Sequence, residues 1–435
     1  MKNFLITLLL LLTNFNLFAQ IQNGPMIGYV QTEEVALWVQ TSKIEDVQFA
    51  YKLVGEKKWT YTQVYQTKEA DAFVCQQVIK PLKSGKKYEY RVVINGQLES
   101  PIGPQIFETQ RSLKNKRKAV DFSFAIGSCA YINEDGYDRP GKPYGGEYQI
   151  FEAIYQSKPD LMLWLGDNVY YREADLATKS TMCHRYTFSR NLPELKKLLA
   201  NIPQYAIWDD HDFGPNDSDG SFLNKTMTKE VFDLFWANPP QNHPNLSGIT
   251  TQFEWSDCQF FLLDNRYERS AITQEAGVKT ILGPTQLDWL KSELLLSKAT
   301  FKFVAMGGQF LNTAPVFENY SANGFDKERQ EIIDFIGQHQ IKNVVFLTGD
   351  RHHSELSILN EQGKPFIYDL TISPLTSGTH DALNEPNSLR VKGSHVAKRN
   401  SGLLKVSGKK NERVLEIELY DSEGQSIWKL PIKAE

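Results

Sequence analysis

The chain has 435 residues, of which 41% are hydrophobic and 12% are aromatic. This length and composition allow a large buried core and suffice for two domains. The formal net charge is -4 at pH 7, and the one local basic run, KNKRK at 114–118, is short. Proteins that bind nucleic acid usually carry an extended positive surface, which this charge balance excludes. We therefore expect a globular protein with no nucleic-acid-binding surface.

The N-terminus, residues 1–19, has the features of a secretory signal peptide. One lysine precedes a leucine-rich stretch, and Ala19 stands before Gln20 as the small residue of a cleavage site. The apolar stretch is shorter than the roughly 20 residues that span a bilayer, and no later segment of the sequence has the length to do so. We expect a cleaved signal and a mature protein that is secreted or periplasmic, with no stable membrane insertion.

Export to an oxidising compartment bears on the four cysteines, Cys75, Cys129, Cys183 and Cys258. An even number of cysteines there permits one or two disulfides, and the sequence leaves the pairing open. Cys129 stands apart because it follows the apolar run FAIGS, at a strand end where side chains face ligands. For Cys129 we therefore weigh a ligand role against a disulfide.

Residues 22–110 alternate apolar and polar positions in short runs such as VALWVQ and KYEYRVVING. Turn signals that contain glycine separate these runs. The pattern is typical of a small antiparallel β-sandwich of the immunoglobulin or fibronectin type. A basic, polar linker then leads to a second predicted domain at 119–435.

In the second domain, fully apolar runs alternate with amphipathic, helix-like stretches. Examples of the runs are LMLWLG, QFFLLD and NVVFLTG. Strands that are apolar at every position are typical of an α/β layered domain, in which helices cover the sheets. Ligands of such sheets bind beyond the carboxyl ends of the strands. The residues that follow each run are therefore the candidates for chemistry.

Potential metal ligands gather at these predicted strand ends. They are Cys129, Asp167, Tyr170, the run Asp209–Asp210–His211–Asp212, and Asp350–Arg351–His352–His353, with Arg266 after a further strand. A calcium loop of the EF-hand type is excluded at NDSDG, because its first and twelfth positions would fall on Pro215 and Thr226. We expect Asp212, Asp217 and Asp219 to cap a helix or stabilise turns. The repeated Gly-Asp turns and the DDH run predict a binuclear metal site.

Six motifs occur in the order GSC, GDNVYY, WDDHD with GPND, LLDNRY, GGQ and TGDRHH. In this order they resemble the PhoD-type alkaline phosphatases of the calcineurin-like metallophosphoesterase superfamily. The resemblance implies a four-layer α/β sandwich of the metallophosphoesterase type, preceded by the small fibronectin-like sandwich. It also implies a secreted, metal-dependent phosphatase that hydrolyses phosphomonoesters, phosphodiesters or both by attack of a metal-bound hydroxide.

The resemblance also implies roles for individual residues. Asp167 bridges two metal ions. The site for Fe³⁺ is completed by Cys129, Tyr170 and His352, and the second ion, Ca²⁺, is held by Asp210 and Asp350. Thiolate, phenolate and imidazole suit a transition ion and carboxylates a hard one, with Zn²⁺ or Mn²⁺ as alternatives. The predicted catalytic residues are His211, which faces the substrate, and Arg266, which holds a phosphate oxygen. The predicted substrate contacts are Arg351 and Asn216.

Two other functions stay open at this point. One is a phosphodiesterase or phospholipase-like hydrolase with a different metal pair, and the other is a secreted surface-binding protein whose metal site is structural. We expect a small-molecule phosphoester as substrate and a monomeric protein. The polar loops at 133–148 and 376–395 are expected to cover the site and to set substrate choice.

Overall fold

The computed structural model describes residues 21–99, 105–113, 119–138, 140–241, 243–275, 277–317, 319–361 and 364–435. The predicted signal peptide at 1–19 and the basic run at 114–118 lie outside the described residues. Within them, no helix combines the length and the apolar character needed to cross a bilayer. All four cysteines lie in the described part of the chain, and all four are buried and free.

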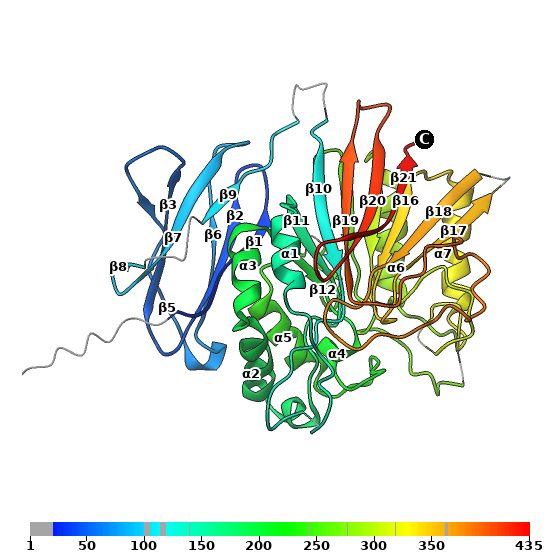
Figure 1. Ribbon diagram of the computed structural model, residues 1–435, viewed down its shortest axis with the longest axis horizontal. Coiled ribbons are helices and arrows are strands. Elements are labelled where there is room, and N and C mark those ends of the chain that lie inside the picture. Colours follow the sequence, from blue (N-terminus) through cyan, green and yellow to red (C-terminus); the bar gives the residue numbers. More distant parts are fainter. Residues whose placement is uncertain are drawn as a thin grey trace, which may run out of the picture.

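The N-terminal part of the chain forms two small antiparallel sheets, drawn in blue in Figure 1. One sheet consists of β1 (Ile21–Val30), β2 (Val35–Thr41) and β6 (Val74–Ile79). The other is built on β3 (Asp46–Leu53) and β7 (Lys87–Ile94), with the short strands β4 (Thr60–Tyr61), β5 (Tyr65–Gln66), β8 (Gln97–Leu98) and β9 (Ile106–Glu108). A 3₁₀ helix, η1 (Glu69–Asp71), precedes β6. This is the small β-sandwich expected from the alternating pattern.

Strand β2 is buried along its whole length, because it packs on both faces. Trp38 points out of the sandwich, and its indole N–H donates to the carbonyl of Leu234 at 2.9 Å. From the other sheet, the hydroxyl of Tyr90 donates to the carbonyl of Ala200 at 2.7 Å. Since these bonds are buried or partly buried, the sandwich is firmly attached to the rest of the molecule.

The second part of the chain contains two six-stranded mixed sheets. In sheet order, the first comprises β12 (Gln204–Ile207), β11 (Leu161–Leu165), β10 (Phe122–Gly127), β19 (Asn400–Ser407), β20 (Val414–Asp421) and β21 (Ser426–Lys433). The second comprises β13 (Thr251–Trp255), β14 (Cys258–Leu262), β15 (Lys302–Ala305), β16 (Val344–Thr348), β18 (Lys364–Thr371) and β17 (Glu355–Glu361). Strands β10 to β12 are parallel, as are β14, β15, β16 and β18.

Helices cover the outer faces of both sheets (Figure 1). Those beside the first sheet are α1 (Ile150–Gln156), α2 (Lys179–Arg190), α3 (Lys196–Asn201), α4 (Asp210–Phe213) and α5 (Lys225–Phe235), with η2 (Glu173–Ala177) and η3 (Pro193–Leu195). Those beside the second sheet are α6 (Gly283–Leu296) and α7 (Asp326–Gln338). The result is the expected four-layer order of helices, sheet, sheet and helices.

The strand sequences explain this layering. On β14, Phe260 packs between the sheets against Phe124 of β10, with ring centroids 5.1 Å apart. The next residue, Phe261, points the opposite way and packs against Trp289 of α6, at 6.1 Å. Because successive side chains of a strand point to opposite faces, a strand between two apolar layers must be apolar at every position. This is why the second domain reads as continuous apolar runs.

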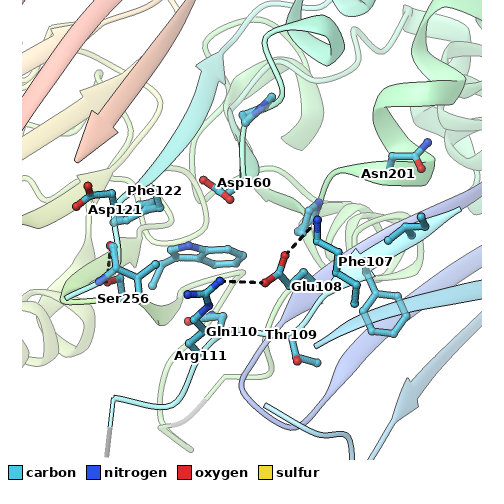
Figure 2. A pocket seen from close by; sticks show the side chains of 16 residues that line it. Phe107, Glu108, Thr109, Gln110, Arg111, Asp121, Phe122, Asp160, Asn201 and Ser256 are labelled. Carbon is cyan, nitrogen blue, oxygen red and sulfur yellow. Dashed lines mark hydrogen bonds and ion pairs between the residues drawn. The ribbon is translucent and has the colours of Figure 1, made fainter. Parts of the chain in front are cut away.

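A pocket of about 380 Å³ lies at the seam between the sandwich and the α/β layers. Figure 2 shows Glu108 and Arg111 of the sandwich on one side, joined by an ion pair of 3.9 Å, with Asp121 and Asp160 across from them. Asp121 and Asp160 immediately precede β10 and β11. The pocket is therefore at the amino ends of the parallel strands, opposite the edge at which the predicted ligands lie.

Candidate metal centre

The strand ends selected from the sequence converge at the carboxyl edges of the two six-stranded sheets. Cys129 and Asp167 follow β10 and β11 of the first sheet, whereas Asp350 and His352 follow β16 of the second. Their φ angles are all positive, at 61°, 52°, 69° and 55° in the same order. Non-glycine residues rarely adopt this conformation, which costs about 1–3 kcal/mol each and is concentrated at functional sites. These four candidate ligands thus share a strained backbone conformation, which is also found at residues outside the motifs.

Cys129, Asp167 and His352 form a first group, in which one ligand atom of each lies within 4.8 Å of the others. Sγ of Cys129 is 3.5 Å from Oδ2 of Asp167. The hydroxyl of Tyr170 donates to the same Oδ2 at 3.1 Å and lies 3.1 Å from Nε2 of His352. Sulfur, phenol, imidazole and carboxylate therefore meet at one point, which suits a transition-metal ion.

Asp167 also belongs to a second group, with Asp210 and His211, and Asp210 belongs to a third, with Asp209 and Asp350. Oxygen dominates these two groups, and oxygen ligands favour a hard cation. The contact of His211 with Asp167 is made by its backbone N–H, which donates to Oδ1 at 3.3 Å. Asp167 thus lies between a mixed-donor group and an oxygen-rich group.

The electrostatics of the centre call for cations. Burial, together with the carboxylates of Asp210 and Asp209, raises the pKa of Asp167 well above its ordinary range. Oδ2 of Asp209 and Oδ1 of Asp210 are buried and accept no hydrogen bond from any described residue. A buried charged oxygen that accepts no hydrogen bond is costly, and metal coordination removes that cost. The residues present therefore fit a two-metal centre.

Arg266 lies inside the centre, with only 3% of its side chain exposed. Its Nε donates to Oδ1 of Asp209, and Nη2 is 3.6 Å from Oδ1 of Asp210. Its Nη1 donates to the carbonyl of Ser218 at 3.3 Å. Although burial alone would lower it, the two carboxylates raise the pKa of Arg266 well above its ordinary value. The guanidinium is therefore directed at carboxylates.

The predicted substrate contacts, Arg351 and Asn216, are paired with carboxylates outside the three ligand groups. Nη2 of Arg351 donates to both carboxylate oxygens of Glu385, at 2.8 and 2.9 Å. Asn216 is exposed, and its amide donates to Oδ2 of Asp217 at 2.6 Å. The backbone N–H of Asp217 in turn donates to Oδ2 of Asp210 at 2.7 Å. Asn216 thus reaches the centre only through its neighbour.

Asp212 caps a turn, as the sequence predicts, whereas Asp209 lies among the candidate ligands. The carboxylate of Asp212 accepts backbone N–H groups of Asn168 and Asp209, at 3.0 and 3.1 Å, and so caps a turn. Burial raises the pKa of Asp212 to about 8. Asp209, to which the sequence assigns no individual metal role, lies with Asp210 and Asp350. Asp209 contacts Arg266, which is distant in sequence, so no local sequence pattern could have revealed this contact.

Both polar loops reach His352, although sequence reasoning named no residue for these contacts. The hydroxyl of Tyr144, from the 133–148 loop, is 3.1 Å from Nδ1 of His352. The hydroxyl of Ser377, from the 376–395 loop, is 3.4 Å from Nε2. Both imidazole nitrogens are therefore contacted from loops that lie over the centre, as the expectation of covering loops requires.

Two glycines allow the strand ends to approach so closely. Gly166 has a φ of +95°, and a Cβ there would lie 2.8 Å from Cβ of Asp209. A Cβ at Gly307 would lie 2.3 Å from Cγ of the same aspartate. Any side chain at either position would displace Asp209. The glycines of the GDNVYY and GGQ motifs thus have a packing role.

Comparison with known proteins bears on this centre. The PhoD-like phosphatase family matches residues 124–419, and a domain of unknown function, DUF7800, matches residues 18–111. The chain is 25% identical to alkaline phosphatase D of Bacillus subtilis (strain 168) over 354 residues, which cover 69% of this chain. The chain spans 58% of the length of that relative.

Two solved structures share the fold. A structure of PhoD superposes with a TM-score of 0.77 at 19% identity, covering 95% of this chain and 93% of that one. A purple acid phosphatase, PPD1 from seeds of yellow lupin (Lupinus luteus), superposes with a TM-score of 0.70 at 10% identity, covering 94% and 74%. Because the family match extends over most of the chain and its motifs meet at one centre, this chain belongs to the PhoD-like phosphatase family.

Proposed function

We propose that this protein is an exported metal-dependent phosphoesterase acting on phosphomonoesters, phosphodiesters or both. The observation that carries the proposal is the position of Asp167. Its carboxylate belongs both to the group with Cys129 and His352 and to the group with Asp210 and His211. Two different metal ions that share a bridging ligand require a carboxylate between two unlike sets of ligands, and Asp167 has this position.

The donor sets support an assignment of the ions. Fe³⁺ would be held by Asp167, Cys129, Tyr170 and His352. Ca²⁺ would be held by Asp167, Asp210 and Asp350, with Asp209 beside them, and Zn²⁺ or Mn²⁺ are the alternatives. When bound, such a pair supplies Lewis acidity that activates water and neutralises charge on the phosphoryl group.

Three observations support a proton-transfer role for His211. Its backbone N–H donates to Asp167, and its ring lies against that of Tyr170, tilted by 33° with centroids 4.1 Å apart. The residue is only partly buried, so the ring borders the open side of the centre. We assign to a ring N–H of His211 the donation of a proton to the leaving-group oxygen. A positioned acid of this kind contributes a factor of about 10²–10⁴ in rate.

The arginines have different surroundings, which favour different roles. Arg266 is directed at Asp209 and Asp210, and these contacts favour a role in holding the ligand carboxylates over the direct phosphate contact expected from sequence. Arg351 is paired with Glu385, and Asn216 is exposed beside Asp217. Arg351 and Asn216 remain proposed substrate contacts.

The test is elemental analysis of the native protein together with a panel of phosphomonoester and phosphodiester substrates. We expect two metal ions at the centre around Asp167 and hydrolysis of at least one class of ester. His211→Ala is expected to lower kcat by about 10²–10⁴ and to leave the metal content unchanged. His339→Ala, a change at an exposed residue after α7, serves as the matched control.

The alternatives give distinct results in the same experiment. A phosphodiesterase or phospholipase-like enzyme would prefer diesters and contain a different metal pair. A surface-binding protein with a structural site would contain metal, hydrolyse none of the esters and be insensitive to His211→Ala. The second result would overturn the proposal.

A further inference from the structure

A second cluster of metal-binding side chains lies apart from the ligand groups around Asp167. It consists of His353, Glu355 and His395, whose ligand atoms lie within 4.8 Å of one another. It shares no residue with the groups that contain Asp167 or Asp210. The cluster therefore needs its own explanation.

The backbone brings these three side chains to one face. Ser354 and Val396 form an antiparallel bridge, with N–H···O bonds of 2.9 and 2.8 Å in the two directions. In such a pairing His395 lies opposite Glu355. His353 and Glu355 are two residues apart on an extended chain, so their side chains point to the same side.

In its neutral form, each histidine of the cluster has one ring nitrogen without a proton. Nδ1 of His353 lies 2.9 Å from the carbonyl oxygen of Arg351, which can only accept, so the proton is on Nδ1. Nε2 of His395 lies 2.9 Å from Oδ1 of Asp381, which places its proton on Nε2. The other nitrogens, Nε2 of His353 and Nδ1 of His395, are buried and have no hydrogen-bond partner among the described residues.

This pattern is the one that metal-binding histidines show, since a ligating imidazole usually donates its second N–H to a carboxylate or a backbone carbonyl. Burial makes it significant, because the side chain of His353 is fully buried and that of His395 is 8% exposed. A buried ring nitrogen with a free lone pair is costly without a partner. Here two such nitrogens belong to one cluster of three side chains.

Glu355 supplies the third ligand. Its Oε1 accepts the side-chain amides of Gln309, Asn312 and Asn387, at 3.1, 3.1 and 2.8 Å. Its Oε2 is 3.6 Å from Nε2 of His353, which is too long for a hydrogen bond. Arg390 also contacts Oε2, so the carboxylate is fixed in orientation and ionised.

We infer that His353 Nε2, His395 Nδ1 and Glu355 Oε2 form a second metal site, for a single divalent transition ion of the zinc type. Two imidazoles and one carboxylate are a common protein ligand set for Zn²⁺, and water can occupy the fourth position. The surrounding charges admit a dication, because Glu385 and Asp381 lie beside the cluster and offset Arg351 and Arg390.

The site would connect the start of β17 to the loop at 376–395. That loop carries Ser377, whose hydroxyl is 3.4 Å from Nε2 of His352, and its His380 N–H donates to the carbonyl of His352 at 2.9 Å. An ion shared by His395 and the start of β17 would hold the covering loop in place. This structural role is separate from the proposed phosphoester hydrolysis.

The experiment measures zinc bound per chain by equilibrium dialysis and elemental analysis of the full-length protein. It compares the wild type with His395→Ala and with His339→Ala as control. We expect the wild type and the control to hold one zinc equivalent more than His395→Ala. Co²⁺ in place of zinc should give the visible bands of a four-coordinate nitrogen and oxygen site in the wild type. These bands should be missing from His395→Ala.

The same comparison in an Asp167→Asn background separates this site from the first centre. The difference of one equivalent should persist there, even if the first centre no longer binds metal and no ester is hydrolysed. Circular dichroism of each variant verifies its fold. Equal zinc content and equal Co²⁺ spectra in wild type and His395→Ala would overturn the inference, whatever the activity of the protein.

Discussion

Replacing Arg266 by alanine is expected to destabilise the protein and to weaken its hold on metal. The guanidinium is 3% exposed and contacts Asp209, whose side chain is 1% exposed. After the substitution, Oδ1 of Asp209 keeps the amide of Asn265, at 2.8 Å, as its described hydrogen-bond donor. The carboxylate would then be a buried charge without its counter-ion.

The magnitude follows from this burial. Removing one partner of a buried ion pair costs about 3–5 kcal/mol. The entropy of unfolding is about 2.1 cal/mol/K per residue, which amounts to about 0.9 kcal/mol/K for a chain of 435 residues. The free-energy loss therefore corresponds to a fall in Tm of about 3–6 °C. The Tm of Arg266→Lys should lie between those of the wild type and Arg266→Ala, because lysine keeps the charge but cannot contact Asp209 and Asp210 together.

The assay is thermal unfolding of wild type, Arg266→Ala and Arg266→Lys, with and without prior chelation, combined with elemental analysis and ester kinetics. The loss should be larger after chelation, since metal ions also neutralise Asp209 and Asp210. An Arg266→Ala protein with unchanged Tm and metal content but a raised KM would refute this reasoning. Arg266 would then be a direct contact of the substrate phosphate.

Three further predictions concern the metal ligands, a glycine and a buried carboxylate. Cys129→Ser should deplete iron and abolish hydrolysis; full iron content and activity would remove Cys129 from the centre. Gly166→Ala should cost about 1–3 kcal/mol of strain plus the clash with Asp209, whereas Gly136→Ala, at φ +85° with no atom within 4 Å, should cost the strain alone in denaturant unfolding. Burial raises the pKa of Asp369 from 3.8 to about 6, so its protonated form favours the folded state. That contribution is present below about pH 4 and is lost as the pH rises through about 6. Asp369→Asn should therefore gain about 3 kcal/mol relative to wild type between pH 4 and 7, and a pH-independent difference would contradict this.

Local sequence was sufficient for much of the architecture. Runs such as LMLWLG and QFFLLD are apolar at every position because both faces of each strand are covered, as the packing of Phe260 and Phe261 shows. The alternating pattern at 22–110 likewise predicts the small sandwich. Since ligands gather at the carboxyl ends of parallel strands, the position of Cys129, Asp167 and Asp350 after such runs was enough to nominate them.

Other features depend on which strands are neighbours, and local sequence carries no such information. Arg266 contacts Asp209 only because the first and second sheets face each other. The same packing brings Asp209 next to the ligands Asp210 and Asp350. His395 meets Glu355 only through the bridge between Ser354 and Val396.

The sequence by itself thus determined the layered α/β class, the family resemblance and the strand ends that carry the chemistry, because burial pattern and motif order are local properties. Only the tertiary structure decided how the carboxylates are paired, which loop residues reach His352, and that His353, Glu355 and His395 share one face. The physical reason is that these contacts join residues far apart in the chain. Their distances and burial are fixed by sheet order and packing, which form only when the whole chain folds.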